Sequence, residues 1–306
     1  MQLVYPKLPR AGLGNMLFVW AKAILFSELN SFPVIAPSWN QLRIGPYLRN
    51  ERDKRMYQHF FTNKNYVSRF SYLLTFLSNR ELYYNPPIEK LDLSNLDQNS
   101  KTSIIYIFDK IPSWNDDFND LKEHQKFIKQ QLIATIRPTV FKTISERPAP
   151  EIAIHVRRGD FKALKPDEKL TSDLAHARTP INWFINVLSV IRKIAGYTIP
   201  VTIFSDGYDQ ELSELLSLPE VHRPLSSSAL SDLFTMSRSK LLIASSRSTF
   251  SAWASYLGQC PTVWHPAHFD SGVFSTEVSK TIFEGGFEPE FMPVPDLLIN
   301  NIKSIF

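Results

Sequence analysis

The sequence predicts an α/β fold with a parallel sheet and two domains, and one observation supports each part of this prediction. In the second half of the chain, short apolar stretches alternate with longer amphipathic ones, which is typical of strands and helices around a parallel sheet. The length of 306 residues exceeds that of a usual single hydrophobic core. We therefore expect two domains.

The second half has the clearer pattern. Residues 151–156 are rich in β-branched side chains, contain no Gly or Pro, and follow Pro148 and Pro150, which favours a buried parallel strand. By the same reasoning we expect further strands at 200–205, 240–244 and 262–264, and helices at 181–194, 208–217, 228–238 and 249–257.

The first half is less regular. A short strand-like start is followed by an amphipathic helix marked by Met16, Leu17, Trp20, Ile24 and Leu25. Residues 31–100 are aromatic, Pro-rich and irregular. Residues 104–108 predict a strand, and 118–136 predict a helix that ends before Arg137 and Pro138. The Pro-rich segment 147–150 is the best candidate linker, so we expect domains at 1–148 and 149–306.

Composition limits the function. The net charge of +4 and the pI near 9.0 suit an anionic ligand or a negatively charged membrane surface. No lysine-rich tract supports a nucleic-acid partner. The single cysteine, Cys260, excludes an intramolecular disulfide and a cysteine-ligated structural zinc. We see neither a signal peptide nor a membrane span and expect a cytoplasmic chain, with at most peripheral contact at the inner face of the membrane.

The most informative motif is the run at 155–160, HVRRGD, at the end of the predicted strand 151–156. Ligands of open α/β sheets bind beyond the carboxyl ends of the strands. Two guanidinium groups there suit a phosphorylated ligand, because their planar forks match phosphate oxygens. The alternative is a structural arginine pair that forms a salt bridge with Asp160.

Two further segments suit phosphate. Gly12, Gly14 and Asn15 stand at a predicted helix start, where glycines permit close backbone approach and helix amides favour anions. The alternative is an ordinary glycine turn with Asn15 as N-cap. Residues 245–251, SSRSTFS, join an apolar strand to a helix, so hydroxyls and free amides converge. A helix cap explains one of these hydroxyls better than it explains five.

Two aspartates are weaker candidates. Asp206 ends the predicted strand 200–205, where a turn or capping role is equally plausible. Asp232 lies in the helix before strand 240–244; its carboxylate is able to accept two hydrogen bonds from a guanine edge, or is simply a charge at a helix start. The sequence contains no Asp-x-Asp and no P-loop motif, so we expect neither a carboxylate-bound Mg²⁺ nor a P-loop enzyme.

The aromatic segment 57–84 has two interpretations. It lines an acceptor groove or docks on a membrane that carries a lipid-linked glycan, or its aromatic side chains belong to the core.

Together these motifs resemble the alpha-1,2-fucosyltransferase family and its alpha-1,6- and protein O-fucosyltransferase relatives. Residues 12–18 look like the family's G-x-L-G-N-Q-(M/L)-F motif, 155–160 match its H-x-R-R-G-D motif, and 243–254 look like its A-x-S-(S/T)-F-S-W-W-A-A motif. Met16 stands where glutamine is usual, Arg247 is inserted or substituted in the third motif, and Ala252 replaces its first tryptophan.

The resemblance implies two Rossmann-like domains facing a cleft, the GT-B type. It makes 1–148 the acceptor side and 149–306 the domain that binds GDP-β-L-fucose. It also implies donor-binding roles, which are as follows: Arg157 for the pyrophosphate with Arg158 in support, His155 for ribose or phosphate, Asp232 for guanine, Ser248 and Thr249 for the β-phosphate, and Gly12, Gly14 and Asn15 for approach from the N-terminal domain.

By the same resemblance, the reaction is an inverting, metal-independent transfer of L-fucose to a glycan hydroxyl, the 2-OH of galactose, in polysaccharide biosynthesis. We expect Arg157, Asp160 and Asn15 to be catalytic, no cofactor, and a glycan acceptor, free or lipid-linked. The general base is open among Asp160, Lys165, Asp167, Glu168 and Asp206. The alternatives are a transferase for another GDP-sugar and a non-catalytic protein that binds a GDP-sugar or glycan.

Overall fold

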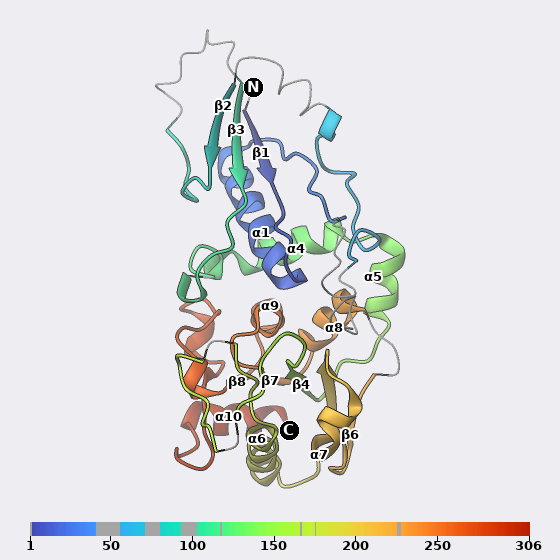
Figure 1. Cartoon of the computed structure of the whole chain (residues 1–306), viewed down its shortest axis with the longest axis vertical. Coiled ribbons are helices and arrows are strands. Elements are labelled where there is room, and N and C mark those ends of the chain that lie inside the picture. The colour runs from blue at the N-terminus through green and yellow to red at the C-terminus, as the bar shows by residue number, and fades with distance from the viewer. Residues whose placement is uncertain are drawn as a thin grey trace. The chain divides into compact units, whose positions relative to one another are not determined.

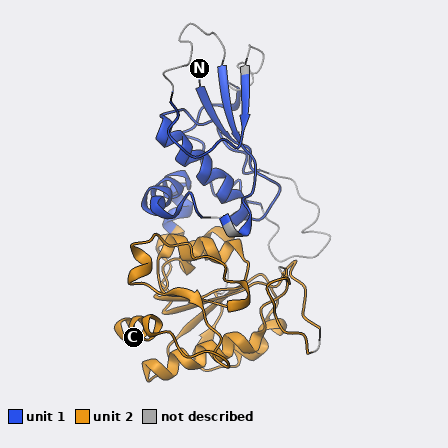
Figure 2. Cartoon of the chain, turned by 90° about the vertical axis from the view of Figure 1, so that its left-hand side faces the viewer, with its two compact units in different colours: residues 1–43, 55–142 blue, residues 44–54, 143–306 orange. Residues whose placement is uncertain are grey.

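The computed structural model of the chain comprises two compact units, coloured separately in Figure 2: residues 1–43 with 55–142, and residues 44–54 with 143–306. Within them the structure describes residues 2–40, 56–70, 80–92, 103–116, 118–165, 167–174, 176–224 and 228–306. The chain passes from unit 1 to unit 2 inside helix α5 (Pro138–Ser145).

Unit 1 is built on a parallel sheet of three described strands in the order β1-β3-β2, shown in Figure 1. The strands are β1 (Gln2–Pro6), β2 (Arg80–Tyr84) and β3 (Ser103–Phe108), and the helices are α1 (Leu13–Asn30) and α4 (Gln125–Thr135), with short 3-10 turns η1 (Trp114–Asp116) and η2 (Lys122–His124). Successive side chains of a strand face opposite sides of the sheet. Phe26 of α1 accordingly packs on Tyr106 and Phe108 of β3, while Ile105 and Ile107 belong to a small core cluster with Leu3 and Ile35.

Unit 2 is built on a parallel sheet of six strands in the order β6-β5-β4-β7-β8-β9. The strands are β4 (Ile152–Val156), β5 (Val201–Ser205), β6 (Val221–His222), β7 (Leu241–Ile243), β8 (Thr262–Trp264) and β9 (Glu284–Gly286). The helices are α6 (Ile181–Ala195), α7 (Ser213–Leu216), α8 (Ala229–Met236), α9 (Thr249–Gly258) and α10 (Asp296–Ile305), with 3-10 turns η3 (Asp209–Leu212), η4 (Pro266–His268) and η5 (Val278–Lys280).

Counted from its first strand, this sheet has the order 3-2-1-4-5-6 of a doubly wound Rossmann fold. Its largest core cluster joins alternate residues of the strands, such as Ile152, Ile154 and Val156 of β4, to helices α6, α7 and α10. Helices α8 and α9 pack on each other, and α9 contacts the opposite face of β4 at His155. The predicted fold class, an α/β protein with parallel sheets, is confirmed. The cleft between the two domains stays a prediction.

The strands predicted at 151–156, 200–205, 240–244 and 262–264 are confirmed as β4, β5, β7 and β8. The helices predicted at 181–194, 228–238 and 249–257 are confirmed as α6, α8 and α9. The predicted helix 208–217 is instead η3 followed by one turn of α7, and the predicted helix 118–136 begins only at η2 and continues as α4.

Local polar contacts explain the late start of that helix. Asp116 accepts hydrogen bonds from the hydroxyl of Ser113 (2.7 Å) and the side-chain amide of Asn119 (3.2 Å). Side chains that bond within a turn compete with the helical backbone pattern. Pro138, expected to end the helix, is the first residue of α5, a position where proline loses no helical hydrogen bond.

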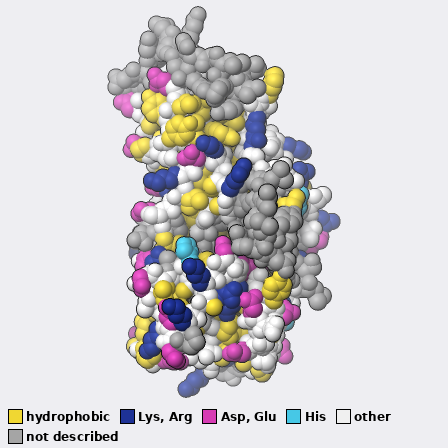
Figure 3. Space-filling view, viewed as in Figure 1, with side chains coloured by type: hydrophobic (Ala, Val, Ile, Leu, Met, Phe, Trp, Pro, Cys, Tyr) yellow, Lys and Arg dark blue, Asp and Glu magenta, His cyan; other side chains and the backbone are white. Residues whose placement is uncertain are grey.

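Basic and acidic side chains are interspersed over the face of unit 2 drawn in Figure 3, in line with the small net charge. Among the described helices, none combines the length and the apolar character that crossing a membrane requires. In the described part of the aromatic segment 57–84, Tyr57, Phe60 and Phe61 are buried, as the core interpretation predicts, whereas Phe70, Tyr83 and Tyr84 are exposed. Residues 71–79 lie outside the described residues.

Edge strand β9 carries a partly buried acid, Glu284. Its Oε2 accepts hydrogen bonds from the backbone N–H groups of Val273 (2.7 Å) and Phe274 (3.2 Å), and its Oε1 accepts one from the hydroxyl of Ser255 (3.3 Å). Burial nevertheless raises the pKa of Glu284 from 4.5 to about 7. The protonated carboxyl is therefore favoured in the folded protein relative to the unfolded chain.

This raised pKa predicts a pH-dependent stability. The folded state binds a proton that the unfolded chain releases, so the free energy of unfolding falls as pH rises from about 4.5 to about 7, by about 3 kcal/mol in total. Glu284→Gln keeps an accepting oxygen and removes the charge, so it should flatten this part of the profile. Urea unfolding from pH 4.5 to 8 tests this, with exposed Glu277→Gln as the control; parallel profiles of wild type and Glu284→Gln would contradict it.

Candidate functional site

The candidate site lies where the carboxyl ends of β4 and β7 meet. These strands are neighbours in the sheet, with Ile154 paired to Ile243, and the connections of the fold depart from them in opposite directions. This is the switch point at which open α/β sheets bind their ligands. The motif at 155–160 follows β4 and the motif at 245–251 follows β7, so the fold brings together two segments that the sequence separates.

A hydrogen bond joins the two segments. The backbone N–H of Arg157 donates to the hydroxyl of Ser245 at 2.9 Å. Ser251, in the first turn of α9, accepts from the backbone N–H of Ser245 at 3.2 Å and lies 2.6 Å from Nδ1 of His155. Two hydroxyls thus fix the strand ends and the start of α9 relative to one another.

His155 is a buried part of this arrangement. It is 4% exposed, and its ring packs against Phe250 at 5.3 Å between centroids. Burial, with a smaller contribution from the positive charge of Arg157, lowers the pKa of His155 to about 3. The imidazole is therefore neutral at physiological pH and supports the first turn of α9 through Ser251; its contact with a donor stays a prediction.

Arg157 is the partly exposed cation of the site. Its guanidinium forms ion pairs with Asp160 and Asp206 and lies 5.6 Å from the ring centre of Phe161. The side chain of Asp160 is 42% exposed and that of Asp206 is 18% exposed. Two carboxylates thus hold the guanidinium where a phosphate is predicted to bind, which also agrees with the structural alternative for Asp160.

Arg158 has a different environment. It is 6% exposed, and its guanidinium donates to the carbonyl of Thr179 at 3.0 Å. Its backbone N–H donates to Oδ1 of Asp206 at 2.7 Å. A Cβ at Gly207 would come within 2.7 Å of Cγ of Arg158, so the turn after β5 closes on this side chain. Through these contacts Arg158 links the end of β4 to Thr179 and to the turn after β5.

The hydroxyl run after β7 shapes the start of α9. The side chain of Ser248 accepts from the backbone N–H of Ser251 and so caps the helix, as the alternative interpretation predicts for one hydroxyl. The backbone N–H of Ser246 donates to the hydroxyl of Thr179 at 3.1 Å. Thr249, half-buried, is the first residue of α9, where backbone amides at a helix N-terminus favour an anion.

Arg247 stands within this run in the left-handed backbone region, with φ of 47°. Its guanidinium donates to Asp270 at 3.1 Å and to the carbonyl of Ser172 at 3.4 Å. Arg247, which departs from the resembled motif, is therefore held by one contact earlier in the chain, at Ser172, and one later, at Asp270. The flanking Ser246 and Ser248 make the contacts described above.

The remaining predicted residues lie elsewhere. Asp232 is half-buried in the first turn of α8, which packs on α9. Gly12, Gly14 and Asn15 stand at the start of α1 in unit 1. The N-cap of α1 is Gly12, so the alternative of Asn15 as N-cap is wrong; Asn15 is the third helical residue, and its Oδ1 is buried with no partner among the described residues. Their approach to a donor stays a prediction.

Sequence reasoning missed three residues that hold the site. Thr179 accepts hydrogen bonds from Arg158 and Ser246, and Asp270 accepts one from Arg247, as described above. Arg223, on the segment after β6, donates to the carbonyls of Ser205 (2.9 Å) and Gly207 (3.1 Å) and pairs with Asp209. Each belongs to no motif and lies far along the chain from its partner, so no spacing pattern could have identified it.

Within the described residues, no group of three or more His, Cys, Asp or Glu side chains is placed to hold a metal ion. Among the described residues, the arginines and the amides at the start of α9 are groups of this site that suit an anionic ligand.

The strand order and this switch-point site define an α/β protein of the Rossmann type. The chain belongs to glycosyl transferase family 11, whose model matches residues 34–275. The resemblance inferred from the three motifs is thereby confirmed, and the protein is a glycosyltransferase.

A solved structure supports the fold. A crystal structure of POFUT1 in complex with GDP is similar, with 12% identity over 86% of this chain and 97% of that chain and a TM-score of 0.51. A structure of NodZ alpha-1,6-fucosyltransferase soaked with GDP-fucose is similar with 15% identity over 86% of this chain and 94% of that chain and a TM-score of 0.47. No curated protein matches the sequence.

The network around Ser251 gives a testable prediction. Ser251→Ala leaves the buried Nδ1 of His155 and the backbone N–H of Ser245 without this partner, and a buried group without its hydrogen bond costs about 1–3 kcal/mol. Chemical denaturation should therefore show a loss of that size. The matched control is Ser189→Ala on the exposed side of α6, which should change stability by less than about 0.5 kcal/mol. Equal losses in the two variants would contradict the assigned network.

Proposed function

We propose that this glycosyltransferase transfers L-fucose from GDP-β-L-fucose to a hydroxyl of a glycan acceptor, with inversion at the anomeric carbon and without a metal ion. The observation that carries the proposal is the position of Arg157 and the start of α9 at the switch point of the sheet of unit 2. The 2-OH of galactose is the acceptor position that the three motifs imply, and polysaccharide biosynthesis the process.

The donor's pyrophosphate has a suitable place there. Arg157 offers a guanidinium fork, and the first turn of α9 offers the backbone N–H of Thr249 next to the capping Ser248. In the structure, Asp160 and Asp206 form ion pairs with the guanidinium of Arg157. Donor binding then exchanges these carboxylates for phosphate oxygens, which keeps the arginine paired throughout.

The reaction is a single displacement. The acceptor oxygen forms a bond to the anomeric carbon while the bond from that carbon to the β-phosphate oxygen breaks, and GDP leaves with the electron pair. Arg157 and the helix amides stabilise the charge that develops on the phosphate. The acceptor's proton passes to a base, for which Asp160 is our candidate, because it is the more exposed of the two carboxylates and is released from Arg157 when phosphate binds.

The other donor-binding residues have supporting parts in the proposal. Arg158 and His155, both buried, hold the strand ends and α9 in place. Asp232 on α8 is the candidate to read the guanine edge. Gly12, Gly14 and Asn15 of unit 1 are the candidates to approach the donor from the N-terminal domain.

The proposal predicts metal-independent release of GDP from GDP-fucose that depends on Arg157. In EDTA, wild type should turn over, and Arg157→Ala should be slower by about 100- to 1,000-fold, the loss typical for removing one donor to a developing charge. Lys193→Ala, which removes an exposed charge from α6, is the control and should keep wild-type activity.

The outcomes separate the alternatives. Turnover that EDTA abolishes would contradict the metal-free mechanism. GDP binding with turnover of a different GDP-sugar would reassign the donor, and GDP binding without turnover of any GDP-sugar would support a non-catalytic binding protein. Failure to bind GDP would overturn the proposed site.

A further inference from the structure

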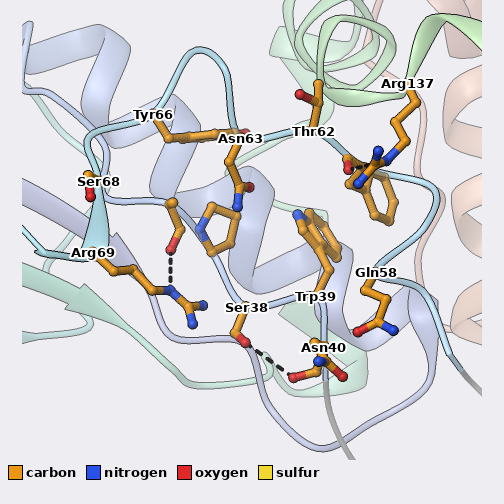
Figure 4. A pocket seen from close by; sticks show the side chains of 13 residues that line it. Ser38, Trp39, Asn40, Gln58, Thr62, Asn63, Tyr66, Ser68, Arg69 and Arg137 are labelled. Carbon is orange, nitrogen blue, oxygen red and sulfur yellow. Dashed lines mark hydrogen bonds between the residues drawn. The ribbon is translucent and has the colours of Figure 1, made fainter.

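Unit 1 contains a pocket of about 630 Å³. Its lining comes from residues within 36–40, from residues within 58–69, and from Arg137 between α4 and α5 (Figure 4). The second of these segments belongs to the aromatic stretch 57–84, for which an acceptor groove was one of the two interpretations. The volume is that of a site for a small molecule, such as one or two sugar rings.

The charge of the pocket has one sign. None of the 13 described residues that line it is Asp or Glu, and the two charged ones are Arg69 and Arg137. They stand on opposite sides of the pocket in Figure 4. The two guanidinium charges, with no carboxylate among the described lining residues, favour an anionic ligand.

Both arginines are anchored in the same way. Nε of Arg69 donates to the carbonyl of Ala36 at 3.1 Å, and Nε of Arg137 donates to the carbonyl of Phe61 at 3.0 Å. Their terminal nitrogens make no hydrogen bond or ion pair with the described residues. A guanidinium fixed through Nε keeps its terminal N–H groups for a ligand, and two such N–H groups match the oxygens of a carboxylate or phosphate.

The rest of the lining is aromatic and amidic. Trp39 and Phe61 stack with ring centres 3.9 Å apart, and the indole N–H of Trp39 has no partner among the described residues. The amide side chains of Asn40, Gln58 and Asn63 are exposed at the pocket. A sugar ring has apolar C–H faces and many hydroxyls, and it is complementary to aromatic rings combined with groups that both donate and accept hydrogen bonds.

We propose that this pocket binds an anionic saccharide, a sugar that carries a carboxylate or phosphate group, with Arg69 and Arg137 as its ligands for the charge. The assignment of this sugar to the acceptor glycan rests on the proposed function. Binding to the pocket does not, because every residue invoked belongs to unit 1, whereas Arg157 and the start of α9, which carry the proposed GDP site, belong to unit 2.

The test is calorimetric titration of the full chain with matched ligands. Digalacturonic acid is compared with its methyl ester, and galactose 6-phosphate with galactose, so that each pair differs in charge. We expect the charged member of at least one pair to bind tenfold or more tightly, and the better pair identifies carboxylate or phosphate as the group. Raising the salt concentration should weaken this binding, since the charges are solvent-accessible.

Variants locate the binding. Arg69→Gln and Arg137→Gln should each weaken the charged ligand by about ten- to a hundredfold, the value of hydrogen bonds to a charged group. Arg69→Lys keeps the charge and loses the fork, so it should fall between wild type and Arg69→Gln. Lys126→Gln removes an exposed charge from α4 outside the pocket lining and is the control.

Three results would overturn the inference: no binding of either charged probe, equal binding within both ligand pairs, or wild-type affinity in both glutamine variants. GDP is titrated in parallel. A chain that binds the charged sugar but not GDP would retain the pocket and lose the proposed function, and the reverse result would retain the function and lose the pocket.

Discussion

The hydrogen bond from the backbone of Arg157 to the hydroxyl of Ser245 joins the segments that follow β4 and β7, and its two residues are 88 positions apart in the chain. It exists because β4 and β7 are neighbours in the sheet, which the strand order places at the reversal point of the fold. The arginine motif, the hydroxyl motif and the first turn of α9 take their positions from this contact. Ser251 reinforces it by joining His155 and Ser245.

The electrostatics of the site follow from that geometry. Burial keeps His155 neutral, so the positive charge is carried by arginines, of which Arg158 is buried in support and Arg157 is partly exposed. Asp160 and Asp206 form ion pairs with Arg157. The structural interpretation of the arginine run is therefore compatible with the proposed function, in which an anionic ligand replaces the ion pairs that orient the guanidinium.

The sequence predicted the part of the fold that rests on local patterns. The strands β4, β5, β7 and β8 were recognisable as apolar runs, but β9 contains two glycines in three residues and β6 has only two residues. The site was predictable where its residues are consecutive, as at 155–160 and 245–251. Thr179 accepts hydrogen bonds from Arg158 and Ser246, and Arg223 donates to backbone carbonyls of the turn after β5. The pocket of unit 1 combines Arg137 with residues 36–40. Such contacts depend on tertiary packing, which leaves no periodic trace in the sequence.

The proposed function requires that the ends of β4 and β7 bind a nucleoside diphosphate, and hydrogen–deuterium exchange of the full chain with and without GDP is the measurement to make. We expect GDP to slow exchange of the backbone amides at 155–160 and 245–251, because these surround the guanidinium of Arg157 and the first turn of α9. The amides at 36–40 and 58–69 of the pocket in unit 1 should exchange as before. Protection confined to that pocket, or no protection at the two strand ends under saturating GDP, would contradict the account.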